Sequence, residues 1–414
     1  MATELARLGV RARAAVKSIS TSSSAARDQA LLAAADLLVA GSATLLRANR
    51  ADLDRARAND LGAAALDRLA LDEGRIESMA AGLRGVATLA DPVGEVVDGW
   101  VRPNGLRVQR VRVPLGVVGI IYENRPNVTS DAAGLCLKSG NVAFLRGSSS
   151  ALESNRAVVA ILREALVKAG LAADGVLLVE DTSHETALEF MRLRGVIDCL
   201  IPRAGRQLIE LLLEHGTVPY VLDGDGNCHV YVDRSADLEM ATDIVLNAKT
   251  QRPGVCNAAE TLLVHRDVAR RFLPAVARAL DGVELRGDPE VCAILPGTTP
   301  ATDDDFATEF LGPCLSVAVV DDIAAAIAHI DRYGSGHSEA IVTGDVGAAD
   351  TFVREVDAAA VLVNASTRFV DGGELGLGAE VGISTQKLHA RGPMGVRELT
   401  CTKWVVRGEG QVRQ

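Results

Sequence analysis

The chain has 414 residues, of which 48% are hydrophobic and 3% aromatic, and its formal net charge is -11. This length and hydrophobicity allow a sizeable buried core and predict two or three globular domains. The negative charge and the shortage of aromatic rings disfavour a nucleic-acid-binding surface, although local Arg and Lys side chains can still bind small anions.

The sequence gives little sign of a membrane, a disulfide framework or a metal. No apolar run approaches the roughly 20 residues of a membrane span, and the N-terminus lacks the basic start and apolar core of a signal peptide. The seven cysteines are scattered without a C-x-x-C pair, which predicts reduced thiols. The histidines show no H-x-x-x-H spacing, so we expect no metal. We expect a cytoplasmic protein that does not bind membranes.

Helical periodicity dominates residues 1–92. Serines 22–24 precede the Ala- and Leu-rich run 25–38, a pattern typical of a helix cap followed by a helix. Asp91-Pro92 ends the helical region, because the residue before a proline avoids helical geometry.

A predicted β-ribbon follows the helical region. Segments 96–101 and 106–113 flank Pro103-Asn104-Gly105, which predicts a hairpin with an Asn-Gly turn. A two-stranded ribbon is barely stable alone, so it must pack on something else, such as another subunit. The β-like segment 402–407 could pair with it.

From residue 116 onward, strand-like runs alternate with helical runs such as 152–168 and 207–214. This alternation predicts parallel, doubly wound sheets, with a second series beginning at His229. The expected strands are 117–122, 142–145, 175–179, 196–201 and 219–222, then 230–232, 259–264, 315–320, 340–343 and 361–364.

The turn after the first of these strands carries Asn124 and Arg125. Ligands bind at the carboxyl ends of strands in open α/β sheets, and an Asn amide there can donate to an oxyanion. The alternative is that Asn124 only stabilises a turn. Neither G-x-G-x-x-G nor a Walker A motif is present, so these residues alone do not predict a dinucleotide site.

Cys256 lies in a Pro- and Gly-containing segment, 251–257, between a helical run and a strand-like run. A thiol on such a loop can present its sulfur to a substrate. The alternative is a structural cysteine, which is the interpretation that we favour for the other six. Arg252 is a candidate to lower the pKa of the thiol.

Three further segments allow two interpretations each. The glycine-rich segment 369–384 and the polar residues after it suit an anion site or a surface loop. Serines 148–150 before Leu152 predict a helix cap or a phosphate site at the helix N-terminus. Asp303-Asp304-Asp305 predicts a solvated turn or a helix start.

Together these segments resemble the γ-glutamyl phosphate reductases, a proline-biosynthesis branch of the aldehyde dehydrogenase superfamily. The resemblance spans nearly the whole chain. It is carried by segments 114–119, 125–129, 226–233, 252–258, 309–313 and 382–393.

The resemblance implies an aldehyde dehydrogenase-like α/β fold with two doubly wound domains and a β oligomerisation element, and therefore a homo-oligomer. The implied domains are an NADP-binding domain (1–93 and 113–225), a catalytic domain (226–394) and the oligomerisation element (94–112 and 395–414).

The implied reaction is the reduction of L-glutamate 5-phosphate to L-glutamate 5-semialdehyde by NADPH, with release of phosphate. Cys256 matches the nucleophile and Asn124 the oxyanion-hole residue. A glutamate 5-kinase partner is plausible, because acyl phosphates of glutamate cyclise readily. The implied cofactor contacts are Arg146 (toward a 2′-phosphate), Ser148, Pro202, Arg203 and Glu309, and the expected substrate contacts are Arg125, His337, Ser384, Lys387, His389 and Arg391.

One departure from the superfamily bears on the reaction. Oxidative aldehyde dehydrogenases carry a Glu in an E-L-G-G-K motif, which acts as the base for thioester hydrolysis. The corresponding region, 222–228, has no clear equivalent. A reductase that forms its thioester from an acyl phosphate needs no such base. The alternatives are an oxidative NAD(P)-linked aldehyde dehydrogenase and a noncatalytic binding subunit.

Overall fold

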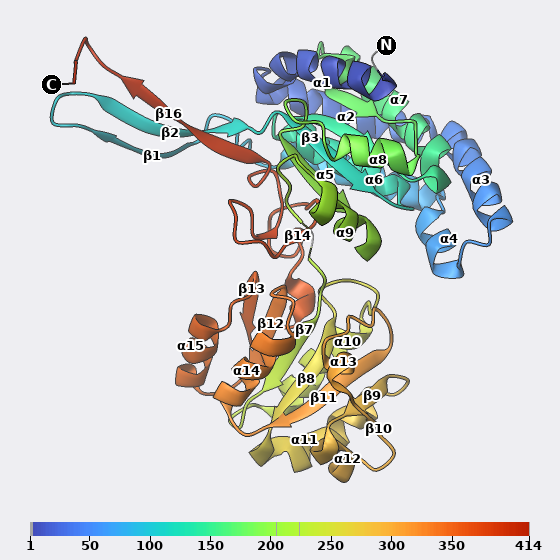
Figure 1. The fold of residues 1–414 in the computed structure, drawn as a ribbon, viewed down its shortest axis with the longest axis vertical. Helices are drawn as coiled ribbons and strands as arrows, with labels where there is room; N and C mark the ends of the chain where they lie inside the picture. Colours follow the sequence, from blue (N-terminus) through green and yellow to red (C-terminus); the bar gives the residue numbers. More distant parts are fainter. Residues whose placement is uncertain (1–2, 204, 223, 414) are drawn as a thin grey trace. The chain divides into compact units, whose positions relative to one another are not determined.

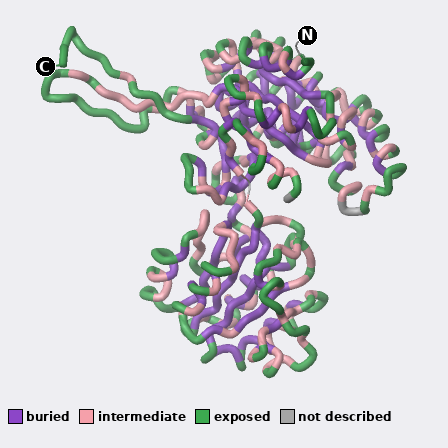
Figure 2. The backbone as a smooth tube through the Cα atoms, in the orientation of Figure 1, coloured by how far each residue is buried: buried purple, intermediate pink, exposed green. Residues whose placement is uncertain are grey.

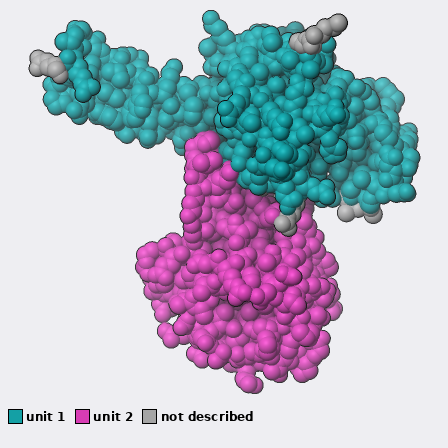
Figure 3. Space-filling model, in the orientation of Figure 1, with its two compact units in different colours: residues 1–222, 376–382, 394–414 teal, residues 223–375, 383–393 magenta. Residues whose placement is uncertain are grey.

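In the computed structural model, which describes residues 3–413 except 204 and 223, the chain divides into two compact units (Figure 3). Unit 1 comprises residues 1–222, 376–382 and 394–414, and unit 2 comprises residues 223–375 and 383–393. The ribbon segments lie within unit 1, and segment 376–382, expected in the catalytic domain, also belongs to unit 1. The role of each unit stays a prediction.

Unit 1 begins with helices, as the periodicity predicts (Figure 1). The side chain of Ser23 accepts a hydrogen bond from the backbone N–H of Ala26, which confirms the predicted cap. No single helix among the described residues is long and apolar enough to cross a membrane. The helices α2 and α3 reach that length and hydrophobicity only when taken together, and the chain bends by 71° between them. The helices are α1 (Glu4–Ser20), α2 (Ser24–Ala40), α3 (Ser42–Ala58), α4 (Ala63–Leu69), α5 (Glu73–Thr88), α6 (Pro126–Lys138), α7 (Leu152–Lys168), α8 (His184–Phe190) and α9 (Arg206–His215).

The parallel sheet of unit 1 has the strand order β5-β4-β3-β6. Its strands are β3 (Val117–Tyr122), β4 (Val142–Arg146), β5 (Val176–Leu178) and β6 (Cys199–Arg203). The order reverses between β3 and β6, and the carboxyl ends at such a switch point are where ligands bind in open α/β sheets.

The prediction of a strand at 219–222 is wrong. Only an isolated bridge between Leu200 and Tyr220 forms there. Pro219 lacks an N–H group and so cannot donate to the sheet ladder.

The ribbon of unit 1 is a three-stranded antiparallel sheet with the order β1-β2-β16. Its strands are β1 (Val96–Val101), β2 (Arg107–Pro114) and β16 (Thr400–Arg407), which confirms the predicted hairpin and its pairing with the C-terminal segment. Most of the ribbon is exposed (Figure 2). Trp100 and Trp404 pack edge to face with ring centroids 5.6 Å apart.

Unit 2 is built on a seven-stranded parallel sheet with the order β10-β9-β11-β8-β7-β12-β13. Alternate residues bury against opposite helical layers. Val230 and Val232 belong to one core cluster and Tyr231 to the other. This confirms the second doubly wound sheet. The strands are β7 (Cys228–Val232), β8 (Ala259–His265), β9 (Glu284–Gly287), β10 (Thr299–Pro300), β11 (Cys314–Val320), β12 (Ser338–Val342) and β13 (Ala360–Val363).

Helices cover both faces of this sheet (Figure 1). Thr302 and Asp305 form a capping box at the start of α13, so the acidic run 303–305 is a helix start. The helices are α10 (Leu238–Thr250), α11 (Arg266–Ala279), α12 (Pro289–Ile294), α13 (Asp303–Phe306), α14 (Ile323–Tyr333) and α15 (Val346–Glu355). A short hairpin, β14 (Ile383–Ser384) and β15 (Gly392–Pro393), completes the unit.

Candidate active site

Cys256 lies in the irregular segment between α10 and β8 and is half-buried. The residues that follow it, from Asn257 into β8, are buried. The segment therefore leads from a helix into the core of the sheet. Cys256 lies in the partly exposed part of the segment, just before the buried residues. This confirms the predicted loop position of the thiol.

Gly226 packs directly against the backbone of Cys256. A Cβ atom at Gly226 would lie 1.6 Å from the carbonyl oxygen of Cys256. The thiol of Cys228 donates to the same oxygen across 3.2 Å. Only glycine allows this close approach of two backbones, so the identity of Gly226 fixes the position of Cys256.

Glu309 is held by the same glycine. Its Oε1 accepts a hydrogen bond of 2.8 Å from the backbone N–H of Gly226. Burial raises the pKa of Glu309, and the hydrogen bond from Gly226 opposes that rise. Gly226 therefore contacts both Cys256 and Glu309, two residues that the sequence predicts for the site. Reasoning from the sequence did not select Gly226 itself.

A buried ion pair lies between the elements that carry this site. Nζ of Lys249, in the last turn of α10, is 2.6 Å from Oε2 of Glu260 on β8, and both side chains are fully buried. Oε1 of Glu260 accepts from the backbone N–H of Leu311 across 3.2 Å. The pair thus connects the segments on both sides of the Cys256 loop with the segment that carries Glu309.

Lys249→Met should destabilise the protein by about 3–5 kcal/mol at neutral pH, because it leaves a buried carboxylate without its cation. Burial already raises the pKa of Glu260 from 4.5 to about 7, against the influence of Lys249. The variant should raise it further. At pH values between the pKa of Glu260 in the unfolded state and its higher pKa in the folded state, the folded state binds more protons than the unfolded state. The free energy of unfolding therefore falls as the pH rises through this range.

Urea unfolding should therefore show that Lys249→Met lowers the free energy of unfolding less at about pH 5 than at about pH 8. The double variant Lys249→Met/Glu260→Met serves as the control, because apolar side chains of similar volume can replace a buried ion pair at little cost. A loss that is the same at both pH values, or no recovery in the double variant, would count against this account.

Asn124 follows β3 in unit 1 and has a left-handed backbone conformation, with φ 46°. Asparagine tolerates this conformation, which agrees with the turn interpretation. Its Oδ1 accepts from Oγ of Ser148, at 3.3 Å, and from Oγ of Ser150. Among the described residues, Nδ2 of Asn124 has no hydrogen-bond partner. The serines thus orient the amide in a way that suits the predicted oxyanion donor.

The prediction that serines 148–150 cap a helix is wrong. The N-cap residue of α7 is Ala151, and no cap residue side chain bonds there. Asp52 of α3 instead accepts from the backbone N–H groups of Glu153, at 3.2 Å, and Ser154, at 2.7 Å. Since a carboxylate occupies this helix N-terminus, the phosphate alternative has no support.

Three predicted cofactor residues lie at the carboxyl ends of strands in the unit 1 sheet. Asn124 follows the carboxyl end of β3 in the same sheet. Arg146 ends β4, and Pro202 and Arg203 end β6. In the sheet register, Ile121 of β3 pairs with both Arg146 and Pro202. Parallel strands therefore bring these residues together at the switch point.

Arg146 is buried, with 6% of the residue exposed. Its Nη2 donates to the carbonyl oxygens of Thr182, at 2.7 Å, and Ser183, at 3.0 Å. Its Nε is buried and has no hydrogen-bond partner among the described residues. A buried donor without a partner is costly, so this N–H group could donate a hydrogen bond to a ligand.

His337 is fully buried at the start of β12. Its Nδ1 is 2.8 Å from Oγ of Ser338 and 3.7 Å from Sγ of Cys228. Burial lowers the pKa of His337 to about 4, so the ring is neutral at pH 7. This environment argues against the predicted contact with an anionic substrate.

The remaining predicted substrate residues are dispersed. Lys387 and Arg391 both form ion pairs with Asp357, the latter at 2.9 Å, and these hydrogen bonds hold the pKa of Asp357 below its usual value. Ser384 is buried in β14, His389 is exposed, and Arg125 immediately precedes α6. Their roles toward a substrate stay predictions.

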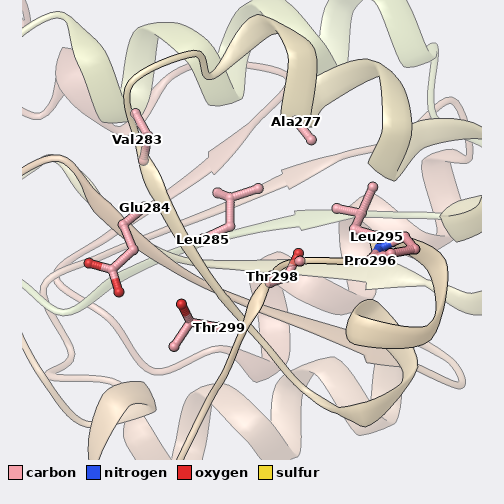
Figure 4. Close-up of a pocket in the computed structure, with 9 residues that line it drawn as sticks. Ala277, Val283, Glu284, Leu285, Leu295, Pro296, Thr298 and Thr299 are labelled. Atoms are coloured by element: carbon pink, nitrogen blue, oxygen red, sulfur yellow. The ribbon is translucent and has the colours of Figure 1, made fainter.

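Unit 2 also has a surface hollow of about 470 Å³ that none of these residues lines (Figure 4). It lies beside segments 283–285 and 295–299 and Ala277 of α11. Among the described residues that line the hollow, Glu284 alone has an ionisable side chain. The hollow therefore lacks the thiol and the cations that the predicted reaction needs.

Residues 2–294 and 293–405 match the model of the aldehyde dehydrogenase family. The chain is 53% identical over 416 residues to the γ-glutamyl phosphate reductase of Moorella thermoacetica, covering 100% of both chains. It is 51% identical over 415 residues to that of Rhodopirellula baltica, covering 100% of this chain and 96% of the relative. The chain belongs to the γ-glutamyl phosphate reductase family.

Solved structures agree with this membership. The crystal structure of the γ-glutamyl phosphate reductase of Thermotoga maritima superimposes with a TM-score of 0.97 at 48% identity, covering 100% of both chains. An acetylating aldehyde dehydrogenase from Geobacillus thermoglucosidasius shares the fold, with a TM-score of 0.71 at 17% identity over 99% of this chain and 98% of that one. The predicted aldehyde dehydrogenase-like α/β fold is confirmed.

Proposed function

We propose that this protein reduces L-glutamate 5-phosphate to L-glutamate 5-semialdehyde with release of phosphate, in proline biosynthesis. Its relatives of about half-identical sequence carry the name of that reductase. The observation that carries the proposal is the half-buried Cys256, whose backbone is fixed by the glycine that also holds Glu309.

In the proposed reaction, the thiolate of Cys256 attacks the acyl carbon of the substrate. A carbon–sulfur bond forms, the carbon–oxygen bond to phosphate breaks, and phosphate leaves with the electron pair, so no strong general acid is required. The backbone N–H of Cys256 would donate to the developing oxyanion, and the role of Asn124 as an oxyanion donor stays a prediction. Segment 222–228 has no clear equivalent of the glutamate that acts as the base in oxidative aldehyde dehydrogenases, which would favour reduction of the thioester over its hydrolysis.

NADPH is the cofactor that we propose. The buried Nε of Arg146, which has no partner among the described residues, and the switch-point position of Pro202 and Arg203 fit a nucleotide with an extra phosphate. Oε1 of Glu309 accepts from Gly226, and Oε2 would accept from ribose hydroxyls. When bound, NADPH supplies the hydride that reduces the thioester. The sulfur of Cys256 then leaves as the aldehyde carbonyl forms.

The reverse reaction tests this function. With glutamate 5-semialdehyde as substrate, we expect reduction of NADP⁺ only when inorganic phosphate is present. An oxidative aldehyde dehydrogenase would proceed without phosphate, and a noncatalytic subunit would show neither turnover nor NADPH binding. A glutamate 5-kinase partner and a cytoplasmic location stay predictions.

We also propose that the protein forms a homo-oligomer through the ribbon. The side chains of Trp100 and Trp404 are 42% and 58% exposed on this narrow sheet. Exposed aromatic residues in a cluster are typical of protein interfaces.

Trp404→Glu should therefore shift the protein to a smaller species in light scattering, because a carboxylate would be buried in the interface. Val412→Glu is the matched control: Val412 is 82% exposed outside the strand, and the change should leave the size unaltered. An unchanged size for Trp404→Glu would exclude this part of the ribbon from the interface.

A further inference from the structure

The turn around Arg368 is held against both ends of the Cys256 loop. Nε of Arg368, in a short 3₁₀ turn (Thr367–Phe369), donates to Oε1 of Gln251 across 2.8 Å. Nδ2 of Asn257 donates to the carbonyl oxygen of Val370 across 2.9 Å. Since Gln251 and Asn257 stand on either side of Cys256, these two bonds hold the turn that carries Arg368 against the Cys256 loop.

The guanidinium of Arg368 is half-buried. Apart from the bond from Nε to Gln251, its side chain makes no hydrogen bond or ion pair within the described part of the chain. Burial and then Arg252 lower the pKa of Arg368, whereas Asp371, Cys256 and Cys228 raise it. The two thiols are therefore among the few groups that favour its positive charge.

The ionisable groups that act on the neighbouring thiol, that of Cys228, are all acidic. Burial raises the pKa of Cys228, and Glu339, Cys256, Glu260 and Glu309 raise it further. Like charges disfavour ionisation of a thiol, so a nearby cation would favour thiolate formation at the site. Lys249 is already paired with one of the carboxylates, Glu260.

We propose that Arg368 is the positioning residue whose charge stabilises Cys256 as the thiolate before the substrate binds. A guanidinium remains charged at any physiological pH and keeps a fixed position when its Nε is anchored. Arg252, the candidate suggested by the sequence, is exposed, so solvent and salt screen its charge. The inference uses the proposed function only in treating Cys256 as the nucleophile.

The test measures the ionisation of Cys256 without cofactor or substrate. The full-length protein is alkylated with iodoacetamide between about pH 5 and pH 10, and the modified Cys256 peptide is quantified by mass spectrometry, because Cys292, Cys314 and Cys401 are also accessible. In Arg368→Gln the pH profile should move upward by about one unit, which lowers the alkylation rate at pH 7 roughly tenfold.

Arg368→Lys should restore part of the rate, and Gln251→Leu, which removes the anchor, should shift the profile in the same direction by a smaller amount. Arg252→Gln is the matched control and should shift it least. An unchanged profile in both Arg368→Gln and Gln251→Leu, or an equal shift in Arg252→Gln, would overturn the proposal. Because the readout is alkylation, a wrong assignment of the overall reaction would show in the phosphate-dependent assay instead.

Discussion

Cys256→Ser should lower the phosphate-dependent reduction of NADP⁺ by roughly 10³-fold or more, since the hydroxyl that replaces the thiol does not ionise near neutral pH. The side chain is half-buried, and serine is close in size to cysteine, so the fold should remain intact. Steady-state kinetics with semialdehyde and phosphate, together with a thermal melt, measure both effects. A fall in kcat with an unchanged melting temperature is the expected result.

Cys401→Ser is the control for this variant. Cys401 is exposed on the ribbon strand β16, and the account gives it no part in the reaction. Its replacement should leave kcat unchanged. Retention of a substantial fraction of the wild-type kcat in Cys256→Ser would remove Cys256 from the role of nucleophile.

Gly226→Ala should both destabilise the protein and reduce its activity severely. The added methyl group would lie 1.6 Å from the carbonyl oxygen of Cys256 and 2.6 Å from its Cα atom, so backbone rather than a mobile side chain has to move. Overpacking of this kind costs about 2–3 kcal/mol or more. The same movement would displace the thiol and the N–H group that Glu309 binds, so kcat should fall together with stability.

Gly254→Ala provides a matched comparison for stability. It introduces the same methyl group two residues before Cys256, where the nearest atom is 3.7 Å away. Urea unfolding should therefore show a much smaller change for Gly254→Ala than for Gly226→Ala. Equal free energies of unfolding for the two variants would show that the close approach at Gly226 is not a constraint.

The sequence predicts the central strands because each is a continuous apolar run. Residues 117–122, for example, form β3 at the expected positions. The sequence does not predict β9 (Glu284–Gly287), which pairs with β10 and β11, since a short and partly charged segment lacks that pattern. The cap of α7 was misjudged for a related reason. Asp52, about a hundred residues earlier, supplies it, and only tertiary structure brings the two together.

The site shows the same division between local and distant information. The loop around Cys256 has a recognisable local sequence, so its position was predictable. Gly226 is one of 39 glycines in the chain, and nothing in the sequence shows that its backbone packs on Cys256. Arg368 lies more than a hundred residues after the thiol, and only tertiary bonds, to Gln251 and between Asn257 and Val370, reveal its position. The pairing of Lys387 and Arg391 with Asp357 was likewise invisible in the sequence.

The most direct test of the central claim is to look for the covalent intermediate. The protein is mixed with L-glutamate 5-phosphate, generated in place because it cyclises, in the absence of NADPH, then quenched in acid and digested. We expect the Cys256 peptide to carry the added mass of one glutamyl group. Hydroxylamine should remove this group, and NADPH added before the quench should leave the peptide unmodified. An unmodified Cys256 peptide under conditions where the same preparation turns over with NADPH would contradict the thioester mechanism.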